Sequence, residues 1–285
     1  MDPYVGWLQK HGTPLFHGGC TWWRLYHRAL VPAAVKPEPV HIAAQGANDL
    51  LRQSGALLLR YFTHTYEQPT QFWYIACNEY AIEKLSKKTR YYVRRGHQNC
   101  TVLRVDSPWL ATHGYDCYLS AHDRYSHTHP VSRQVFQQEL QTCAGGPFEF
   151  WAVLCEQQLA TYCKCVVGGD YVAALVLKSH PAYLHLYPVY TLLDDLLTTY
   201  VGNDHKPVTY GFRSIAHDTN IQHFLEKFGF HHVYCDLNVV YRPPVQRFVS
   251  LIMPFKSLLD HIPSTNSSAL LKGLLTQEQI RRSFL

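Results

Sequence analysis

Three apolar runs between residues 148 and 178 constrain the fold of this chain more than any other feature. The runs are Phe148–Cys155, Leu159–Val167 and Tyr171–Lys178, and they are separated by short polar segments at 156–158 and 168–170. Apolar runs of this length, bounded by turn residues, are typical of β-strands, and connections this short join antiparallel neighbours. The pattern therefore predicts an antiparallel meander near the centre of the chain.

Segments on both sides of the meander predict further helices and strands. Apolar residues at steps of three or four predict a helix over 78–95, in which Ser86 is a candidate N-cap and Gly96 a candidate C-cap. Helices at 114–125 and 132–143 precede the meander. After it we expect a strand at 183–187, a helix at 192–200, a strand at 207–211, a helix at 220–228 and a strand at 232–241. The expected fold class is α/β, a mixed sheet in which an antiparallel meander is followed by a βαβαβ unit, with helices on both faces.

The composition argues against disorder and against a dedicated nucleic-acid-binding protein. Hydrophobic residues make up 47 % of the chain and charged residues 16 %, which supplies enough apolar material for a large core. The net charge of +5 is mild, whereas dedicated nucleic-acid binders usually carry a denser basic stripe. The chain is therefore expected to be a folded protein whose basic residues, if they bind a polyanion, do so locally.

The cysteines and the apolar stretches predict the compartment. Nine cysteines are spread along the chain without any CxxC pair, so we expect free thiols, no disulfide framework and a reducing environment. The first residues lack a basic segment followed by an apolar one, and no apolar stretch approaches the roughly 20 residues that a membrane span needs. The sequence predicts a cytoplasmic protein without a membrane span.

The segment 219–230, TNIQHFLEKFGF, resembles a motif of the GNAT acyltransferase superfamily. The likeness is to the pattern of Asn, an aliphatic and an aromatic residue, Glu-Lys and Gly-Phe, with Phe224 one position early. The local physics agrees, because Asn220 can cap the first turn of a helix and Gly229 can end it in the left-handed conformation. The resemblance implies that Asn220 begins a helix beside the acyl donor.

A second segment, Leu85–Arg95 (LSKKTRYYVRR), is similar to the opening of the Fem-type aminoacyl transferases, a branch of the GNAT fold. The resemblance implies an aminoacyl-tRNA donor, with phosphates contacted through Lys87, Lys88, Arg94 and Arg95. The plainer interpretation of such a run is a solvated basic helix face. Together the two likenesses cover residues from about 85 to 241.

The chain departs from acetyl-CoA-using GNAT enzymes in one place. Those enzymes have a Gly-rich turn after their fourth strand, whose N–H groups hold the donor pyrophosphate. The corresponding stretch 187–192, YPVYTL, has no glycine, and Val189 and Tyr190 would obstruct close backbone approach. No bound cofactor is expected, and the donor stays open between acyl-CoA and aminoacyl-tRNA.

The candidate catalytic residues are Tyr187, Tyr190 and His217. Either tyrosine could line the site and protonate a leaving group, although both could equally be packed aromatics. His217 lies in the loop between the strand at 207–211 and the next helix, where α/β folds often place their chemistry, and it could act as a base. The alternative for His217 is a solvated side chain.

The candidate substrate-binding residues are Arg213, Asn220, Arg124 and Tyr125. Arg213 could hold a carboxylate or phosphate in a bidentate manner, or it could simply pair with Asp218. Arg124 and Tyr125 lie in the connection that borders the acceptor site in GNAT topology, and a solvated loop is the alternative. The histidines near them lack a recognisable ligand spacing, so no metal site is expected.

The expected domains are an N-terminal extension at 1–84, which packs on the core or forms a reduced second lobe, a GNAT-like domain at 85–244, and a partly helical tail at 245–285. The resemblance implies an acyltransferase that transfers an acyl or aminoacyl group to the amine of a small molecule or peptide. The alternatives are a non-catalytic GNAT-like module that binds a ligand or partner, and an RNA-binding protein that uses the basic helix.

Overall fold

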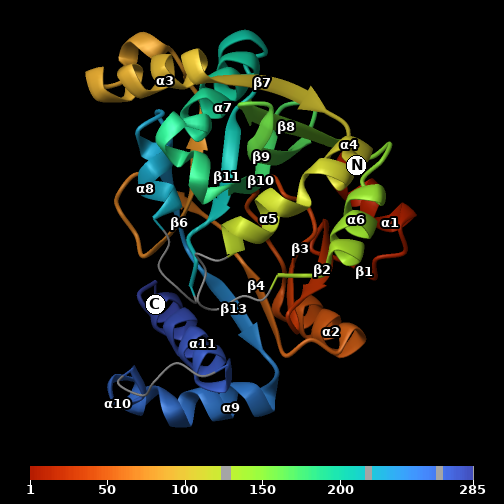
Figure 1. Ribbon diagram of the computed structural model, residues 1–285. Helices are drawn as coiled ribbons and strands as arrows, with labels where there is room; N and C mark the ends of the chain where they lie inside the picture. Colours follow the sequence, from red (N-terminus) through yellow and green to blue (C-terminus); the bar gives the residue numbers. More distant parts are fainter. Residues whose placement is uncertain (123–129, 216–219, 261–265, 285) are drawn as a thin grey trace. The chain divides into compact units, whose positions relative to one another are not determined.

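The computed structural model describes residues 1–122, 130–215, 220–260 and 266–284 (Figure 1). The chain divides into two compact units, each built from several separate segments. The first unit consists of Met1–Trp7, Ile75–Gly211 and Ile221–His231. The second consists of Leu8–Tyr74, Phe212–Asn220 and His232–Leu285. The domain boundaries expected from the sequence, 1–84, 85–244 and 245–285, stay a prediction.

The predicted meander is present in the first unit. Strands β8 (Phe148–Cys155), β9 (Gln158–Val167) and β10 (Val172–Ser179) are antiparallel neighbours. Glu156 and Gln157, which join β8 to β9, both have positive φ angles, as a tight two-residue hairpin turn requires. Strand β7 (Cys100–Val105) pairs antiparallel with β8, and β11 (Val208–Phe212) pairs parallel with β10.

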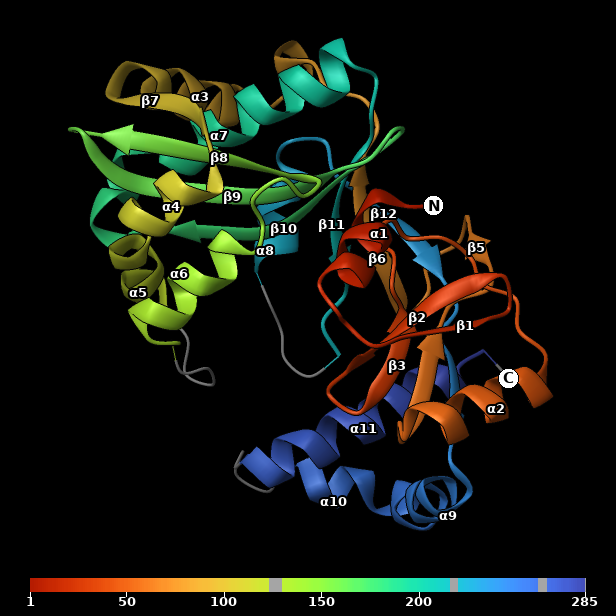
Figure 2. The ribbon, with the colours of Figure 1, turned by 90° about the vertical axis from the view of Figure 1, so that its right-hand side faces the viewer.

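Helices cover both faces of this sheet, as the sequence predicts (Figure 2). Helices α3 (Lys87–Asn99) and α7 (Pro188–Leu197) lie together on one side, and α7 packs on β8 and β9. On the other side, α4 (Ser107–His113), α5 (Tyr115–His122) and α6 (Arg133–Gln141) share a buried cluster with side chains of β8 and β9. The order β10, α7, β11, α8 (Ile221–Glu226), β12 (His231–Cys235) is the predicted βαβαβ unit.

Several predicted boundaries are wrong, each for a local physical reason. The helix expected from residue 78 begins at Lys87, because Ser86 caps it by accepting a hydrogen bond from the Thr89 N–H at 3.1 Å. Gly96 does not end that helix but lies inside it. Residues 183–187 form no strand, because His180 accepts the Ala182 N–H and Pro181 then starts the 3₁₀ helix η2 (Pro181–Leu186). The expected strand at 232–241 is divided into β12 and β13 (Asn238–Tyr241).

The remaining elements of the first unit are short. They are α1 (Pro3–Lys10), whose last residues belong to the second unit, the 3₁₀ turn η1 (Ile82–Lys84) and the π-helical segment η3 (Thr198–Asn203). Strand β6 (Phe72–Cys77) contributes Ile75–Cys77 to this unit and its first residues to the other.

The second unit contains the N-terminal residues that the sequence left unassigned. They form β1 (Leu15–Gly18), β2 (Thr21–Tyr26), β3 (Ala29–Pro32), α2 (Ala44–Ser54) and β4 (Leu58–Tyr61). A five-stranded sheet has the order β1-β2-β3-β4-β13, and its core holds the fully buried Trp23, Leu30 and Leu59. The short β5 (Thr65–Tyr66) pairs with β12. Helices α9 (Pro243–Ile252), α10 (Lys256–Asp260) and α11 (Asn266–Arg282), with the 3₁₀ turn η4 (Met253–Phe255), complete the unit.

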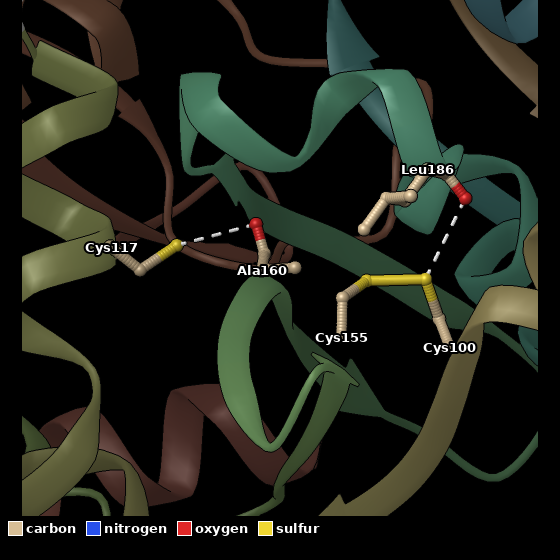
Figure 3. The surroundings of a disulfide bond; sticks show 5 residues. All are labelled: Cys100, Cys117, Cys155, Ala160 and Leu186. Atoms are coloured by element: carbon tan, nitrogen blue, oxygen red, sulfur yellow. Dashed lines mark hydrogen bonds between the residues drawn. A yellow bond between two sulfur atoms is a disulfide. The ribbon is translucent and has the colours of Figure 1, made fainter.

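A disulfide joins Cys100 and Cys155, which corrects the expectation that all thiols are free (Figure 3). The two residues face each other in the β7–β8 register, with their Cα atoms 4.5 Å apart, although 55 positions separate them in the sequence. Pairing of this kind depends on which strands become neighbours, so the cysteine spacing could not reveal it. The other cysteines are free, and most of them are buried. No helix in the described residues is long and apolar enough to cross a bilayer.

Candidate active site at the end of strand β10

Strands β10 and β11 separate soon after they meet. Among the described residues, they pair only at Val172–Val208 and Ala173–Thr209, while β10 continues to Ser179 along β9. A register shift between Ala174 and Val176 marks a β-bulge where the separation begins. Beyond this bulge, the β11 side of β10 has no strand partner, so its backbone N–H groups there are candidates to polarise a substrate carbonyl.

Lys178 lies on this unpaired part of β10 and was not singled out by sequence reasoning. Burial lowers the pKa of its ammonium group, with the Cys117 thiol opposing the effect. Lowering the pKa of a lysine raises the fraction of neutral amine, the form that accepts a proton. The same burial raises the pKa of Cys117 to about 12, so that thiol stays protonated. A lysine at the end of an apolar strand gives no sequence signal for this role.

The segment after β10 forms a closed turn in place of a Gly-rich loop. Tyr187 ends η2 and precedes α7 with φ of 63° and ψ of 37°, the left-handed conformation that costs a residue with a Cβ roughly 1–2 kcal/mol. Pro188 follows at the first position of α7, where its fixed φ suits a helix start. The turn therefore gives α7 a rigid beginning and presents no run of backbone N–H groups like a pyrophosphate cradle.

An aromatic cluster surrounds this turn. The rings of Tyr92 and Tyr187 stack with centroids 4.5 Å apart, and Tyr190 meets Tyr187 edge to face at 5.9 Å. Tyr190 also contacts Phe224 and Phe228 of the α8 segment, at 5.2 and 5.5 Å. Burial raises the pKa of the Tyr190 phenol, assisted by Tyr92 and Tyr187. A phenol is already protonated at neutral pH, so the raised pKa makes Tyr190 a weaker acid, and its ring contacts give it a packing role.

Helix α3 approaches α7 closely beside this cluster. A Cβ added at Gly96 would lie 2.0 Å from Thr191 Oγ1 and 2.8 Å from the Tyr187 carbonyl oxygen, so only glycine fits there. One residue later, His97 Nε2 lies 2.8 Å from Asp194 Oδ2, and Tyr80 donates its hydroxyl hydrogen to Asp194 Oδ1 at 2.5 Å. Burial and this hydrogen bond raise the pKa of Tyr80 far above its ordinary value. The network fixes α3 against α7.

His97, Asp194 and Asp195 are also the described residues whose geometry best suits a metal ion, since their ligand atoms lie within 4.8 Å of one another. The direct His97–Asp194 hydrogen bond and the Tyr80 contact already satisfy these groups without an ion. Burial raises the pKa of Asp195, with Asp194 adding to the effect and His97 opposing it. We interpret the cluster as a structural hydrogen-bonded contact between α3 and α7.

The outer face of α3 carries an exposed cationic stripe, defined by Lys87, Lys88, Arg94 and Arg95. Tyr91 lies among these cations and is 47 % exposed, with the Arg94 guanidinium 5.8 Å from its ring. The helix contains no acidic residue. The Lys88 ammonium lies 5.9 Å from the Tyr92 ring, which in turn stacks on Tyr187. The cationic stripe is thus continuous with the turn after β10.

Other predicted site residues lie elsewhere or outside the described residues. Arg213 is in the second unit, where its Nη1 donates to the Gln71 carbonyl oxygen at 2.6 Å and its guanidinium lies 4.7 Å from the Trp73 ring. Asn220 is exposed and also belongs to the second unit. His217, Arg124 and Tyr125 lie outside the described residues. The structure therefore brings together Tyr187 and Tyr190, and the roles of all these residues stay predictions.

The described residues of the first unit enclose hollows, of which two are relevant here. One of about 600 Å³ lies between the start of α3 and the end of α8, with Tyr80, Ser86, Thr89 and Gly229 in its wall. The other, of about 530 Å³, lies beside β7 and β8, where Arg104 is 3.5 Å from Glu149. The first borders both the basic helix and the GNAT-like segment, so it is the better candidate for part of a substrate site.

Comparison with known proteins informs the fold. No protein-family model and no curated protein matches the chain. Among solved structures, the C-terminal domain of a putative lysylphosphatidylglycerol synthetase from Agrobacterium fabrum is similar, with a TM-score of 0.57 and 7 % identity over 88 % of this chain and 91 % of that one. FemX is similar with a TM-score of 0.55 and 9 % identity, over 88 % and 93 % of the two chains. This chain has a Fem-like GNAT fold.

A third structure agrees with this assignment. L-PGS from Bacillus licheniformis has a TM-score of 0.51 and 10 % identity, and the likeness covers 86 % of this chain and 94 % of that one. The Fem-like fold thus extends over most of the chain, including the N-terminal residues that the two sequence motifs did not cover. At these identities the likeness concerns the fold alone.

Proposed function

We propose that this chain is an aminoacyl transferase that takes its acyl group from an aminoacyl-tRNA and transfers it to an amine. The observation that carries the proposal is the continuity between the exposed cations of α3 and the turn after β10, through Lys88, Tyr92 and Tyr187. Phosphates bound along α3 would place the end of a nucleic acid near the unpaired part of β10. The Fem-like fold supports the same reaction class.

The turn itself favours a tRNA donor over acyl-CoA. A CoA pyrophosphate is normally held by several backbone N–H groups at a Gly-rich turn before a helix. Here Tyr187 and Pro188 occupy that place, and Pro188 has no N–H group to donate. A donor whose phosphates bind to side chains of α3 does not need the cradle.

The proposed reaction has a simple balance of bonds. The amine nitrogen forms a bond to the ester carbonyl carbon, and the ester C–O bond to the ribose then breaks. Lys178 is the candidate acceptor of the proton lost by the amine, and N–H groups of β10 beyond the bulge stabilise the oxyanion. The leaving ribose oxygen takes up a proton, for which the hydroxyl of Tyr187 is the candidate donor. Each of these roles is a proposal.

The direct test is transfer from bulk aminoacyl-tRNA carrying radiolabelled amino acids to a mixture of small amines and short peptides. The wild type is expected to transfer the labelled amino acid to the amines, which forms acid-soluble amides. The variant Lys178→Met is expected to lower the rate of this transfer at least about 100-fold. Tyr183→Phe, a change of similar size in the neighbouring η2, is the matched control. Isothermal titration with acetyl-CoA is expected to give no heat of binding.

A second candidate function is a non-catalytic Fem-like module. The observation that favours it is the aromatic packing of Tyr190 against Tyr92, Phe224 and Phe228, which gives this ring a structural role. The same assay separates the two functions. Binding of charged tRNA without any transfer to the amine mixture would favour the module, whereas binding of neither tRNA nor acetyl-CoA would exclude the proposed transferase.

A further inference from the structure

The C-terminal helices of the second unit expose a row of large apolar side chains. Phe248 is 48 % exposed, Leu251 73 %, Phe255 57 % and Leu258 69 %. The four residues follow one another at steps of three, four and three along α9, η4 and α10, so they share one side of this nearly continuous helical segment. We call them the apolar row.

The other side of the same segment is attached to the core of its unit. Val249 is buried in a cluster with Tyr241 and Ile280, and α11 packs against α9 and α10 (Figure 1). The exposed apolar row is therefore not a core face displaced by poor packing, because the core-facing residues of α9 already have their partners. A soluble protein seldom exposes four large apolar residues in one row without a ligand for them.

The charges of the segment indicate what covers the row. From Arg242 to the end of α10, the sequence contains three cations, Arg242, Arg247 and Lys256, and one acidic residue, Asp260. Arg247 is exposed and lies one turn before Leu251, at the edge of the row. A segment that combines exposed Phe and Leu side chains with more cations than acids complements an anionic lipid surface, into which the apolar side chains enter while a cation such as Arg247 meets the headgroups.

A second copy of this chain fits the same face less well. In a two-fold symmetric contact, the row would meet itself, so two copies of a segment with three cations and one acidic residue would face each other. We therefore propose that α9, η4 and α10 bind the surface of an anionic lipid bilayer, with Phe248, Leu251, Phe255 and Leu258 inserted at the interface. This inference is independent of the proposed transferase activity, because it rests on the second unit alone.

The test is cosedimentation of the full chain with vesicles of equal parts phosphatidylcholine and phosphatidylglycerol, at low salt. The wild type is expected to bind these vesicles at least about tenfold more strongly than pure phosphatidylcholine vesicles. The double variant Leu251→Ser, Phe255→Ser is expected to lose at least about tenfold in binding. Leu25→Ser, a change at a leucine that is 48 % exposed on β2, is the control and should stay within about twofold.

A charge variant keeps the test decisive if the double variant folds poorly. Arg247→Glu leaves the apolar row intact and is expected to weaken binding to anionic vesicles about fivefold or more, without changing the residual binding to neutral ones. Light scattering of the protein without vesicles measures its oligomeric state alongside the binding assay. Failure of the wild type to sediment with anionic vesicles would overturn the proposal, as would a wild-type dimer that Leu251→Ser, Phe255→Ser converts to a monomer.

Discussion

The outer face of α3 and the apolar row of α9–α10 are both exposed helical surfaces on segments with more cations than acidic residues, yet they differ in what accompanies the charge. On α3, the four cations of the stripe accompany one exposed aromatic ring, Tyr91. On α9–α10, four large apolar side chains have Arg247 at their edge. A hydrated polyanion such as RNA is bound by many charges, whereas a bilayer also requires buried apolar area. The ratio of apolar to cationic side chains therefore distinguishes the proposed RNA-binding surface on α3 from the proposed lipid-binding surface on α9–α10.

Charge reversal on α3 should have the largest effect on binding, and it tests whether the two surfaces bind different partners. The variant Lys87→Glu, Lys88→Glu, Arg94→Glu, Arg95→Glu is expected to lower tRNA affinity at least about 100-fold in a filter-binding assay, because four phosphate contacts become repulsions. Vesicle binding by the same variant should change little. Equal losses of tRNA and vesicle binding would mean that the two surfaces are not distinct.

Reduction of the disulfide should be the next largest effect, and it concerns the first unit alone. Removing the Cys100–Cys155 link by the variant Cys100→Ser, Cys155→Ser is expected to cost about 2–4 kcal/mol in unfolding free energy, since the link closes a loop of 55 positions. Urea unfolding of the wild type with and without dithiothreitol measures the same difference. An unfolding midpoint of the wild type that is the same with and without dithiothreitol would contradict the pairing.

The contact of α3 with α7 positions the cationic stripe beside the turn, and Gly96 tests it. Gly96→Ala is expected to destabilise the fold by about 1–3 kcal/mol, because the new Cβ meets Thr191 and the backbone of Tyr187. Gly202→Ala is the control, since a Cβ there meets only the Leu197 carbonyl oxygen at 3.9 Å. Thermal unfolding compares the two variants, and similar melting temperatures would show that the close contact is not present.

The last expected effect is a loss of stability at alkaline pH, which is absent at neutral pH. Burial raises the pKa of the thiols of Cys117 and Cys235 to about 12 and that of Cys77 to about 11, against about 9 in the unfolded chain. Because the unfolded state releases these protons first, stability is full below pH 9 and falls as pH rises from 9 towards 12. Each thiol contributes at most about 1.4 kcal/mol per pH unit. Urea unfolding midpoints that stay level from pH 8.5 to 10.5 would contradict the assignment.

Sequence reasoning succeeded where structure depends on local pattern. The meander at 148–179 and the Ser86 cap follow from residues close together in the chain, and both were predicted. The left-handed Tyr187, the disulfide and the position of Gly96 inside α3 depend on which segments become neighbours, so no single run of residues contains that information. Lys178 was missed for the same reason, because its pKa is lowered by burial in the folded chain.

The roles of the candidate site residues stay predictions. Tyr187 and Tyr190 lie together at the turn before α7. Arg213 was chosen because it follows a strand, yet in the structure its guanidinium lies over Trp73 and donates to a backbone carbonyl of the second unit. Position after a strand identifies where chemistry can occur, but it does not say which way a side chain points.

The central claim is that a nucleic acid bound along α3 brings its end to the turn after β10. Photo-crosslinking tests it most directly, using tRNA with a photoreactive nucleotide near its 3′ end and mass spectrometry to locate the crosslinked peptides. We predict crosslinks to residues 84–95 and 180–190 that disappear in the charge-reversed α3 variant. Crosslinks confined to the second unit, or unchanged by the charge reversal, would contradict the account.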